Sequence, residues 1–407
     1  MQSNNKKKII NDPVHGFINI PSEIIFDLIQ HKNFQRLRRI KQLGLSDMVY
    51  PSATHSRFSH SLGAMFLMYQ ALDTLKQKGE EISQEEIQNS LIAILLHDIG
   101  HSPFSHCLED FFFTNPHEEI SLALMKRMNV PKMAIDIFSN TYKKRFLHQL
   151  VSSQVDMDRL DYLTRDSFFT GVTEGVVGTQ RIIKMLAVFN DELVIEQKGI
   201  YSIEKFILSR RLMYWQVYMH KTAVSADILL KTILKRARQL SKEGKKVTEN
   251  ISKYLSFFIE NDFLDINNEI ALEYFTLLDD FDIINAVKSW TENKDFILSY
   301  LSSCLLKRHL GKMQVQSSVF DNKIIEEEIE NFVKKNSKIS LTKEEVENYF
   351  IITDQLKNKT YNFNDDKINI LLKNGEVKEI FNASDQLDKD FLGKEIKKYF
   401  LYKLSIY

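Results

Sequence analysis

Apolar residues recur every three or four positions through most of the first two-thirds of the chain. One such run contains Leu62, Met65, Phe66, Tyr69, Leu72 and Leu75 and ends before Gly79. This spacing puts the side chains on one face of a helix, where they pack against the protein interior. The pattern therefore predicts a mainly α-helical protein with a helical bundle as its core.

Local signals predict where one of these helices begins and ends. Ser83, followed three residues later by Glu86, has the form of a capping box, in which each side chain satisfies a free backbone amide of the first turn. The helix that follows is expected to deliver His97 and Asp98 near its C-terminal end. Gly100 then stops the helix, so the next two histidines are expected on the turn beyond it.

Two short β-hairpins are also predicted, and neither is expected to form a large sheet. Residues 186–195 have a turn at Asn190-Asp191, and residues 368–380 have one at Asn374-Gly375. Lys, Glu, Asn and Asp become more frequent after about residue 240. We therefore predict a catalytic core over residues 1–240. Residues 241–407 are expected to form a helical and small α+β region that serves assembly or regulation.

Composition excludes several classes of protein. The 54 Lys and Arg residues balance 54 Asp and Glu residues, so there is no overall bias toward nucleic acid or anionic membranes. Cys107 and Cys304 are too few for a disulfide framework, and no apolar run approaches the ~18 residues of a membrane span. A cytoplasmic protein is expected. No P-loop, GxGxxG or nucleophile-elbow motif occurs, which argues against a kinase, a Rossmann dehydrogenase or an α/β-hydrolase.

Histidines and carboxylates are concentrated in one part of the chain. Six of the 11 histidines lie between positions 55 and 117, interleaved with four carboxylates: His55, His60, His97, His101, His106, His117, Asp98, Glu109, Asp110 and Glu118. One histidine is usually structural, but this grouping combines ligands for a hydrolytic divalent metal with histidines for proton transfer. The predicted ligands of one ion are His60, His97, Asp98 and Asp158. These residue types do not choose among Mn, Fe, Mg, Co and Zn.

Two polar stripes accompany this grouping. Asp158, Tyr162 and Asp166 follow one another at four-residue intervals, as do Arg210, Tyr214 and Tyr218. Each trio shares one helix face. Either stripe alone would be typical of the protein core or of a solvated surface. Beside a metal site the same residue types suit a nucleotide: arginine can clamp a phosphate, tyrosine can stack on a base or sugar, and aspartate can accept a hydrogen bond. Together they predict a nucleotide pocket.

A series of motifs then resembles one known family. The motifs are NDPVHGFI (11–18), FQRLRRIKQLG (34–44), HSRFSHSLG (55–63), HDIGHSPFSH (97–106), HEE (117–119), VDMDRLDYLTRD (155–166) and YMHK (218–221). HDxGH alone marks a broad superfamily, whereas the flanking motifs resemble the HD-domain deoxynucleoside triphosphate triphosphohydrolases. The resemblance implies an HD-domain helical fold that hydrolyses dNTPs, dGTP among them, to deoxynucleosides and inorganic triphosphate.

The resemblance also implies roles for individual residues. The metal ligands would be the four named above, and the catalytic group would be His101, His106, His117, Glu118 and Glu109. Gln42 and Leu43 resemble residues that recognise the sugar 3′-hydroxyl and exclude ribose. The remaining phosphate and sugar contacts would be Arg57, Arg159, Tyr162, Asp166, Arg210, Tyr214 and Tyr218.

Some positions depart from the family pattern. Arg159 stands where the family has a lysine, a change that keeps the charge but alters its geometry. Met219 stands where the family has a glutamine beside the base, so the preferred base stays open. Gln30 stands at the position where relatives have an aspartate that binds a guanine nucleotide activator. An allosteric nucleotide site is still expected because three of its residues are retained, namely Asn11, Gln35 and Arg38. Lys221 and Arg181 add candidate phosphate contacts at a subunit boundary, which favours a homo-oligomer, either a dimer or a tetramer.

Two alternatives remain open. The first is an HD phosphohydrolase acting on another nucleotide or phosphoester. The second is a nucleotide-sensing or single-stranded nucleic-acid-binding protein with weak catalysis, served by the basic residues Arg36, Arg38, Arg39 and Lys41. Neutral net charge and a full catalytic set favour the enzyme.

Overall fold

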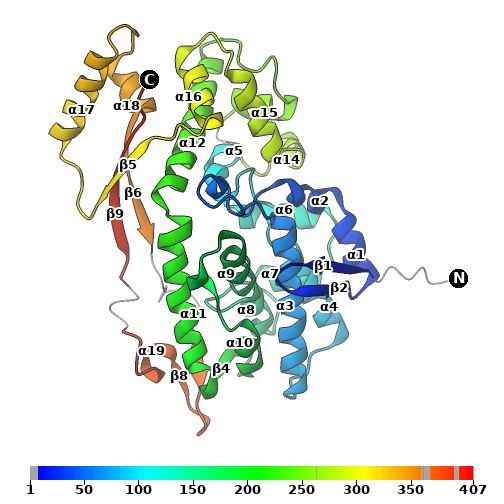
Figure 1. Cartoon of the computed structure of the whole chain (residues 1–407). Coiled ribbons are helices and arrows are strands. Elements are labelled where there is room, and N and C mark those ends of the chain that lie inside the picture. Colours follow the sequence, from blue (N-terminus) through cyan, green and yellow to red (C-terminus); the bar gives the residue numbers. More distant parts are fainter. Residues whose placement is uncertain (1–7, 263, 359–360, 362–366, 389–393, 407) are drawn as a thin grey trace, which may run out of the picture.

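The computed structural model describes residues 8–262, 264–358, 361, 367–388 and 394–406. Helices predominate, as predicted. Figure 1 shows α11 and α12 (green) running through the middle of the molecule, with α1 to α4 on one side and the strands β5, β6 and β9 on the other. The first twelve helices are α1 (Glu23–Gln30), α2 (Lys32–Arg36), α3 (Arg57–Gln77), α4 (Gln84–Leu95), α5 (Glu109–Phe112), α6 (His117–Arg127), α7 (Lys132–Phe138), α8 (Arg145–Val151), α9 (Met157–Thr170), α10 (Thr179–Met185), α11 (Ile200–Met213) and α12 (Lys221–Lys242).

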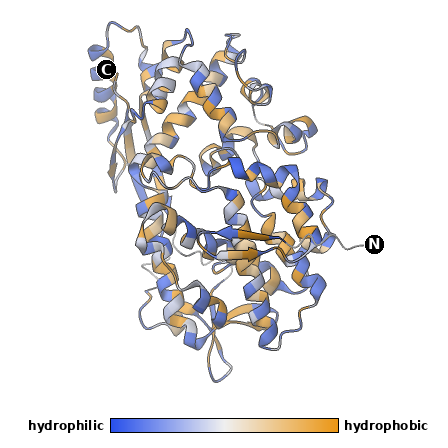
Figure 2. Ribbon diagram, turned by 45° about the vertical axis from the view of Figure 1, so that its right-hand side comes forward, coloured by the Kyte–Doolittle hydropathy of each residue, from blue (hydrophilic) through white to orange (hydrophobic). Residues whose placement is uncertain are grey.

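Helix α3 is the centre of the core. It packs against α4 and α9, and its residues Ala64, Leu67 and Ala71 are wholly buried. Figure 2 shows hydrophobic and hydrophilic residues mixed along most helices, the pattern of elements with one face toward the interior. Among the described residues, no helix combines the length and the apolar character needed to cross a bilayer.

The capping box at the start of α4 is confirmed. The Ser83 hydroxyl accepts from the Glu86 amide at 3.1 Å, and the Glu86 carboxylate accepts from the Ser83 amide at 2.8 Å. The predicted end is wrong, because α4 stops at Leu95 and His97 and Asp98 lie in the turn beyond it. Ser121 of α6 stabilises this turn: its hydroxyl accepts from the Gly100 amide and donates to the His97 carbonyl.

Both predicted hairpins form, but they join into one sheet. Strands β3 (Leu186–Phe189) and β4 (Glu192–Glu196) flank Asn190 and Asp191, whose φ angles are 51° and 62°. Strands β7 (Asn369–Leu371) and β8 (Val377–Glu379) form the second hairpin. Parallel pairing of Ile195 with Ile370 gives a four-stranded sheet in the order β3-β4-β7-β8, which local patterns did not predict.

The other strands were not predicted either. A hairpin of β1 (Ile9–Asp12) and β2 (Gly16–Asn19) lies near the N-terminus, and β5 (Lys312–Gln316), β9 (Ile396–Lys403) and β6 (Ile351–Asn358) form a three-stranded sheet. The later helices are α13 (Lys253–Glu260), α14 (Glu269–Phe275), α15 (Asp280–Trp290), α16 (Phe296–Leu306), α17 (Asn322–Lys335), α18 (Lys343–Tyr349) and α19 (Ile380–Ala383). The division at residue 240 stays a prediction; α12 continues to Lys242.

Candidate metal and nucleotide site

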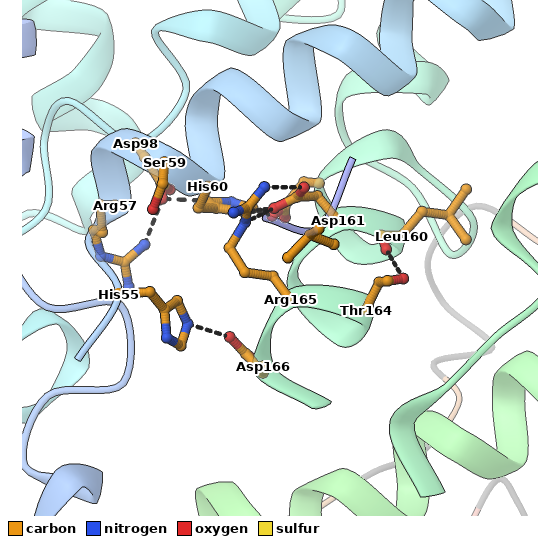
Figure 3. Close-up of polar contacts among 12 residues, drawn as sticks. His55, Arg57, Ser59, His60, Asp98, Leu160, Asp161, Thr164, Arg165 and Asp166 are labelled. Atoms are coloured by element: carbon orange, nitrogen blue, oxygen red, sulfur yellow. Dashed lines mark hydrogen bonds and ion pairs between the residues drawn. The ribbon is translucent and has the colours of Figure 1, made fainter. Parts of the chain in front are cut away.

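The predicted site residues surround one cavity of about 440 Å³. Its walls come from the start of α3, the turn after α4, the 3₁₀ helix η3 (Ser105–Leu108), α6, α9, α12 and the π-helical turn η6 (Tyr214–Tyr218). Segments more than 100 residues apart therefore meet at this cavity. Figure 3 shows part of its wall, where residues of α3 and α9 approach one another.

The four predicted metal ligands lie together, and three of them, His97, Asp98 and Asp158, line the cavity. Nε2 of His60 lies 3.0 Å from an Asp158 oxygen and 3.7 Å from an Asp98 oxygen. Nε2 of His97 lies 3.2 Å from Asp98 and 3.5 Å from Asp158. Ligand atoms of His60, His97 and Asp158 are all within 4.8 Å of one another. Two nitrogens and two carboxylates are a suitable donor set for a catalytic divalent ion.

Hydrogen bonds on the far side of each ring determine which nitrogen faces the cluster. Nδ1 of His60 lies 2.7 Å from a carboxylate oxygen of Asp161, and Nδ1 of His97 lies 2.6 Å from the Ile94 carbonyl. A carbonyl or ionised carboxylate only accepts, so both Nδ1 atoms carry the proton. Nε2 of His97 is buried and has no hydrogen-bond partner within the described chain, and Nε2 of His60 faces Asp158. Two ring nitrogens that face carboxylates in this way fit a bound cation, which would take the place of any proton on them.

The electrostatics favour positive charge at the same point. Burial alone would lower the pKa of His60, but hydrogen bonds to Asp158 and Asp161 and the charge of Asp98 raise that pKa to about 10. Burial would raise the pKa of Asp98, yet the Arg57 guanidinium and nearby histidines hold it well below its usual value. Burial would likewise raise the pKa of Asp158, but hydrogen bonds to His60 and His97 hold it well below its usual value. Asp98 and Asp158 therefore both stay ionised, and the site attracts a cation.

A second cluster of histidines lies beside the first. Glu109 bridges two of them: one oxygen lies 2.5 Å from Nδ1 of His117 and the other 2.8 Å from Nδ1 of His106. Burial would raise the pKa of Glu109, but these hydrogen bonds outweigh it and lower that pKa strongly. The ring of His101 stacks on His117 at 3.9 Å between centroids. Glu118 is largely exposed, with an oxygen 3.4 Å from Nε2 of His117.

His101 differs from its two neighbours because it is buried. Its Nε2 lies 3.2 Å from an Asp98 oxygen, while its Nδ1 is buried without a partner within the described residues. Burial and the nearby Arg57 lower the pKa of His101 well below its usual value, so the ring stays neutral. Gly100 allows this packing, because a Cβ at position 100 would clash with the backbone of His117 and Ser121 on α6.

Most of the predicted phosphate and sugar contacts line the cavity. These lining residues are Gln42, Leu43, Arg57, Arg159, Tyr162, Asp166, Tyr214 and Tyr218. Asp166 is held by His55 and by the Tyr218 hydroxyl, each at 2.8 Å. Arg210 is not among the lining residues; it donates to Gln154 at 3.1 Å. Tyr214 and Tyr218 belong to a π-helical turn, a feature that often occurs at functional sites.

Sequence reasoning missed several residues of this region. Cys107 and Asp227 line the cavity, and neither was assigned a role. Asp161 contacts His60, and its partner Arg165 is four residues further along α9. The four-residue spacing of Asp161 and Arg165 within a conspicuous motif was a usable signal. Nothing in the sequence pattern linked Asp227 of α12 to the cavity.

The residues proposed for an allosteric site lie elsewhere and do not line this cavity. Asn11 is in β1. Arg38 donates to Gln35 at 2.9 Å, and its guanidinium lies 3.6 Å from the ring centroid of Phe58.

The cations of the basic segment make contacts with the protein itself, although Arg38 and Arg39 are exposed. Arg36 is buried and donates to the Leu278 carbonyl at 2.5 Å, Arg39 pairs with Asp279, and Lys41 pairs with Asp47 at 2.7 Å. The nucleic-acid-binding alternative stays a prediction, because Arg38 and Arg39 remain exposed beside these contacts.

A helical core that gathers histidines and aspartates around such a cavity defines a metal-dependent phosphohydrolase. Comparison with known proteins agrees. A model of the HD domain matches residues 57–166, and a model of the HD associated region matches residues 177–259. The chain belongs to the HD-domain phosphohydrolase family.

The relatives cover most of the chain. The crystal structure of a phosphohydrolase from Bacteroides thetaiotaomicron is 49% identical, with a TM-score of 0.92, over 98% of this chain and 99% of that chain. The uncharacterized protein YwfO of Bacillus subtilis is 33% identical over 93% of this chain and 88% of its own length. A Dictyostelium discoideum homolog of the deoxynucleoside triphosphate triphosphohydrolase SAMHD1 is 31% identical over 59% of this chain. The chain spans 51% of that homolog's length.

Proposed function

We propose that this phosphohydrolase cleaves deoxynucleoside triphosphates, dGTP among them, to a deoxynucleoside and inorganic triphosphate. The observation that carries the proposal is the composition of the one cavity. His97, Asp98 and Asp158 line it with His60 directly behind Asp158, and two arginines and three tyrosines line the same cavity. Relatives named as deoxynucleoside triphosphate triphosphohydrolases add support.

In this proposal the four clustered residues hold one divalent ion. When bound, such an ion supplies Lewis-acid chemistry, withdrawing charge from a phosphoryl group and making water acidic enough to attack at neutral pH. Arg57 and Arg159 then neutralise the triphosphate. Arg57 is oriented by Ser105 and Asp98, and Arg159 by the Ser153 carbonyl at 2.6 Å, so neither guanidinium needs to be ordered on substrate binding.

The histidine cluster handles protons. Glu109 keeps the Nδ1 protons of His106 and His117 on its own side, so each Nε2 is free to take up or release a proton. A histidine protonated at Nε2 delivers that proton to the departing 5′-oxygen. His101, neutral and stacked on His117, positions that ring, and Glu118 lies next to its Nε2.

The sugar end of the cavity rests on Gln42, Leu43 and Tyr162. The side-chain carbonyl of Gln42 is buried and, among the described residues, has no hydrogen-bond partner. An unsatisfied acceptor in a cavity favours a ligand that donates, such as a sugar 3′-hydroxyl. Tyr214 and Tyr218 supply ring faces for the sugar or base, and Asp166 fixes the Tyr218 hydroxyl.

A product assay tests the proposal. Purified protein with Mn²⁺ is given each dNTP and each rNTP, alone and in mixtures, and scored for nucleoside and intact triphosphate. We expect triphosphate from dNTPs and little from rNTPs. Release of monophosphate or pyrophosphate, or turnover only of another phosphoester, would contradict the proposal in favour of a different HD phosphohydrolase.

Regulation and assembly are part of the same proposal. Asn11, Gln35 and Arg38 are proposed to form an allosteric nucleotide site in a cytoplasmic homo-oligomer, with residues 241–407 serving assembly or regulation. The Arg38–Gln35 hydrogen bond outside the catalytic cavity supports a separate site. Light scattering with and without nucleotide mixtures should show a dimer or tetramer. A monomer under every condition would contradict this part.

A further inference from the structure

We propose that the turn between β1 and β2 is part of the metal site: His15 and Asp12 position His60 through Asp161 and Arg165 and so set the affinity for the divalent ion. This inference rests on the metal site proposed above. It adds a segment that lies more than 40 residues before the region matched by the HD-domain model.

Asp161 lies at the centre of this arrangement, and both of its oxygens are fully used. One oxygen lies 2.6 Å from Nε2 of His15 and 3.0 Å from an Arg165 nitrogen. The other lies 2.7 Å from Nδ1 of His60 and 2.8 Å from Nε of Arg165. Figure 3 shows the side chains of His60, Asp161 and Arg165 gathered together between α3 and α9. Four donors around one carboxylate fix its position and leave it no freedom to rotate.

The consequence for His60 is a fixed ring and a fixed tautomer. Asp161 is wholly buried and forms an ion pair with Arg165 at 2.8 Å, the arrangement of a carboxylate that accepts from a guanidinium. An ionised carboxylate only accepts, so Nδ1 of His60 must donate and Nε2 must offer its lone pair to the metal. Carboxylates behind a metal-binding histidine orient the ring and raise its basicity.

The close approach of α3 and α9 depends on Gly63. This glycine lies one turn after His60 on α3, and a Cβ there would clash with the Asp161 carboxylate and the Arg165 guanidinium. The missing side chain leaves the space in which this pair sits behind His60. The sequence therefore provides both the charged pair and the space for it.

The β1–β2 turn closes the arrangement from outside. Asp12 accepts from the backbone amides of Val14 and His15, each at 2.9 Å, which shapes the turn. Asp12 also accepts from Arg165 at 2.8 Å. The side chains of His15 and Asp12 are only 7% and 5% exposed. This turn near the N-terminus thus contacts both Asp161 and Arg165, the pair that supports His60.

Metal titration of the full-length chain tests this inference without substrate. Metal-stripped wild type, His15→Ala and Phe17→Ala are titrated with Mn²⁺ by calorimetry, and folding is checked by circular dichroism. Phe17 is the control, because it lies in the same hairpin and is 70% exposed. We expect roughly 10-fold weaker Mn²⁺ binding for His15→Ala, the low end of the effect of losing the partner directly behind a ligand, because His15 acts through Asp161; Phe17→Ala should not change the affinity.

Wild-type affinity in folded His15→Ala would overturn the inference. If that variant does not fold, His15→Gln and His15→Asn decide. Gln can extend an amide N–H to Asp161 and is expected to bind Mn²⁺ more tightly than Asn, so equal affinities would overturn the inference. Failure of the proposed reaction looks different: wild type would bind Mn²⁺ and yet release no triphosphate from any dNTP.

Discussion

At the scale of single residues, function depends on which atom faces the cavity. His60 and His97 differ from other buried histidines in how their ring nitrogens are used. Nδ1 of His60 bonds Asp161 and Nδ1 of His97 bonds the Ile94 carbonyl, so Nε2 of each ring faces carboxylates. Sequence alone nominated both residues through their spacing and motifs. It did not say which nitrogen would be presented, since that depends on partners behind each ring.

His97→Ala is expected to abolish metal binding and reduce turnover by more than about 100-fold, because one of four ligands is lost. The fold should persist, since His97 lies in the turn after α4 rather than inside a helix. Metal content by mass spectrometry and triphosphate release measure the effect. His148→Ala is the matched control, because His148 also bonds a backbone carbonyl, that of Ile137, but lies outside the metal cluster. Full activity of metal-free His97→Ala would refute the mechanism.

Asp227 makes a prediction about pH and stability. Burial raises the pKa of Asp227 from 3.8 to about 7, with Cys107 and Lys231 offsetting only part of this. The folded protein therefore binds this proton more tightly than the unfolded chain, so the contribution of Asp227 to stability is fully present below pH 3.8 and is lost as pH rises through about 7.

Asp227→Asn should remove this pH-dependent loss of stability. We expect the loss to be on the order of 2 kcal/mol in the free energy of unfolding, after allowance for the partial exposure of Asp227. Urea unfolding between pH 5 and pH 8 measures the difference from wild type. Asp73→Asn, an exposed aspartate on α3, should keep the wild-type slope. The same slope in Asp227→Asn would show that this carboxyl group titrates normally.

At the scale of elements, helix starts follow local chemistry and helix ends depend on neighbours. The Ser83–Glu86 capping box was predicted and is present, because its partners are three residues apart. The end of α4 was predicted two or three residues too late. Ser121 of α6 satisfies the backbone of His97 and Gly100 in the turn, a partner that periodicity does not reveal.

Gly63→Ala separates helix propensity from packing. Alanine in the interior of α3 should stabilise the helix by up to ~1 kcal/mol. The clash with Asp161 and Arg165 should outweigh that gain and destabilise the protein by roughly 1–3 kcal/mol. Denaturant unfolding measures the sign. Gly178→Ala is the control, because the nearest atom to its added Cβ is 3.9 Å away. A stabilised Gly63→Ala protein would contradict the packing argument.

At the scale of the whole molecule, strands far apart in sequence complete one sheet. Ile195 of β4 and Ile370 of β7 are paired and both almost wholly buried. The hairpin of residues 368–380 is therefore packed on an element of the first 240 residues. Such coupling predicts that the chain unfolds as a cooperative unit in this region rather than as two independent parts.

Ile370→Ala should cost roughly 2–5 kcal/mol, the usual effect of truncating a buried isoleucine. The denaturation curve should shift as a single transition when followed by both circular dichroism and tryptophan fluorescence. Ile324→Ala is the control, since Ile324 is 47% exposed on α17; its effect should stay within about 0.5 kcal/mol. Two separate transitions in Ile370→Ala would instead support an autonomous C-terminal region.

The sequence by itself determined the helical class, both hairpin turns and the chemistry of the site, because these depend on spacing within a few residues and on residue type. The tertiary structure alone decided that His15 reaches Asp161 and Asp12 reaches Arg165, that Gly63 leaves room for this pair, and that β7 pairs with β4. These contacts join segments that lie far apart in the sequence. They form only when the packed core brings those segments together, so no local pattern encodes them.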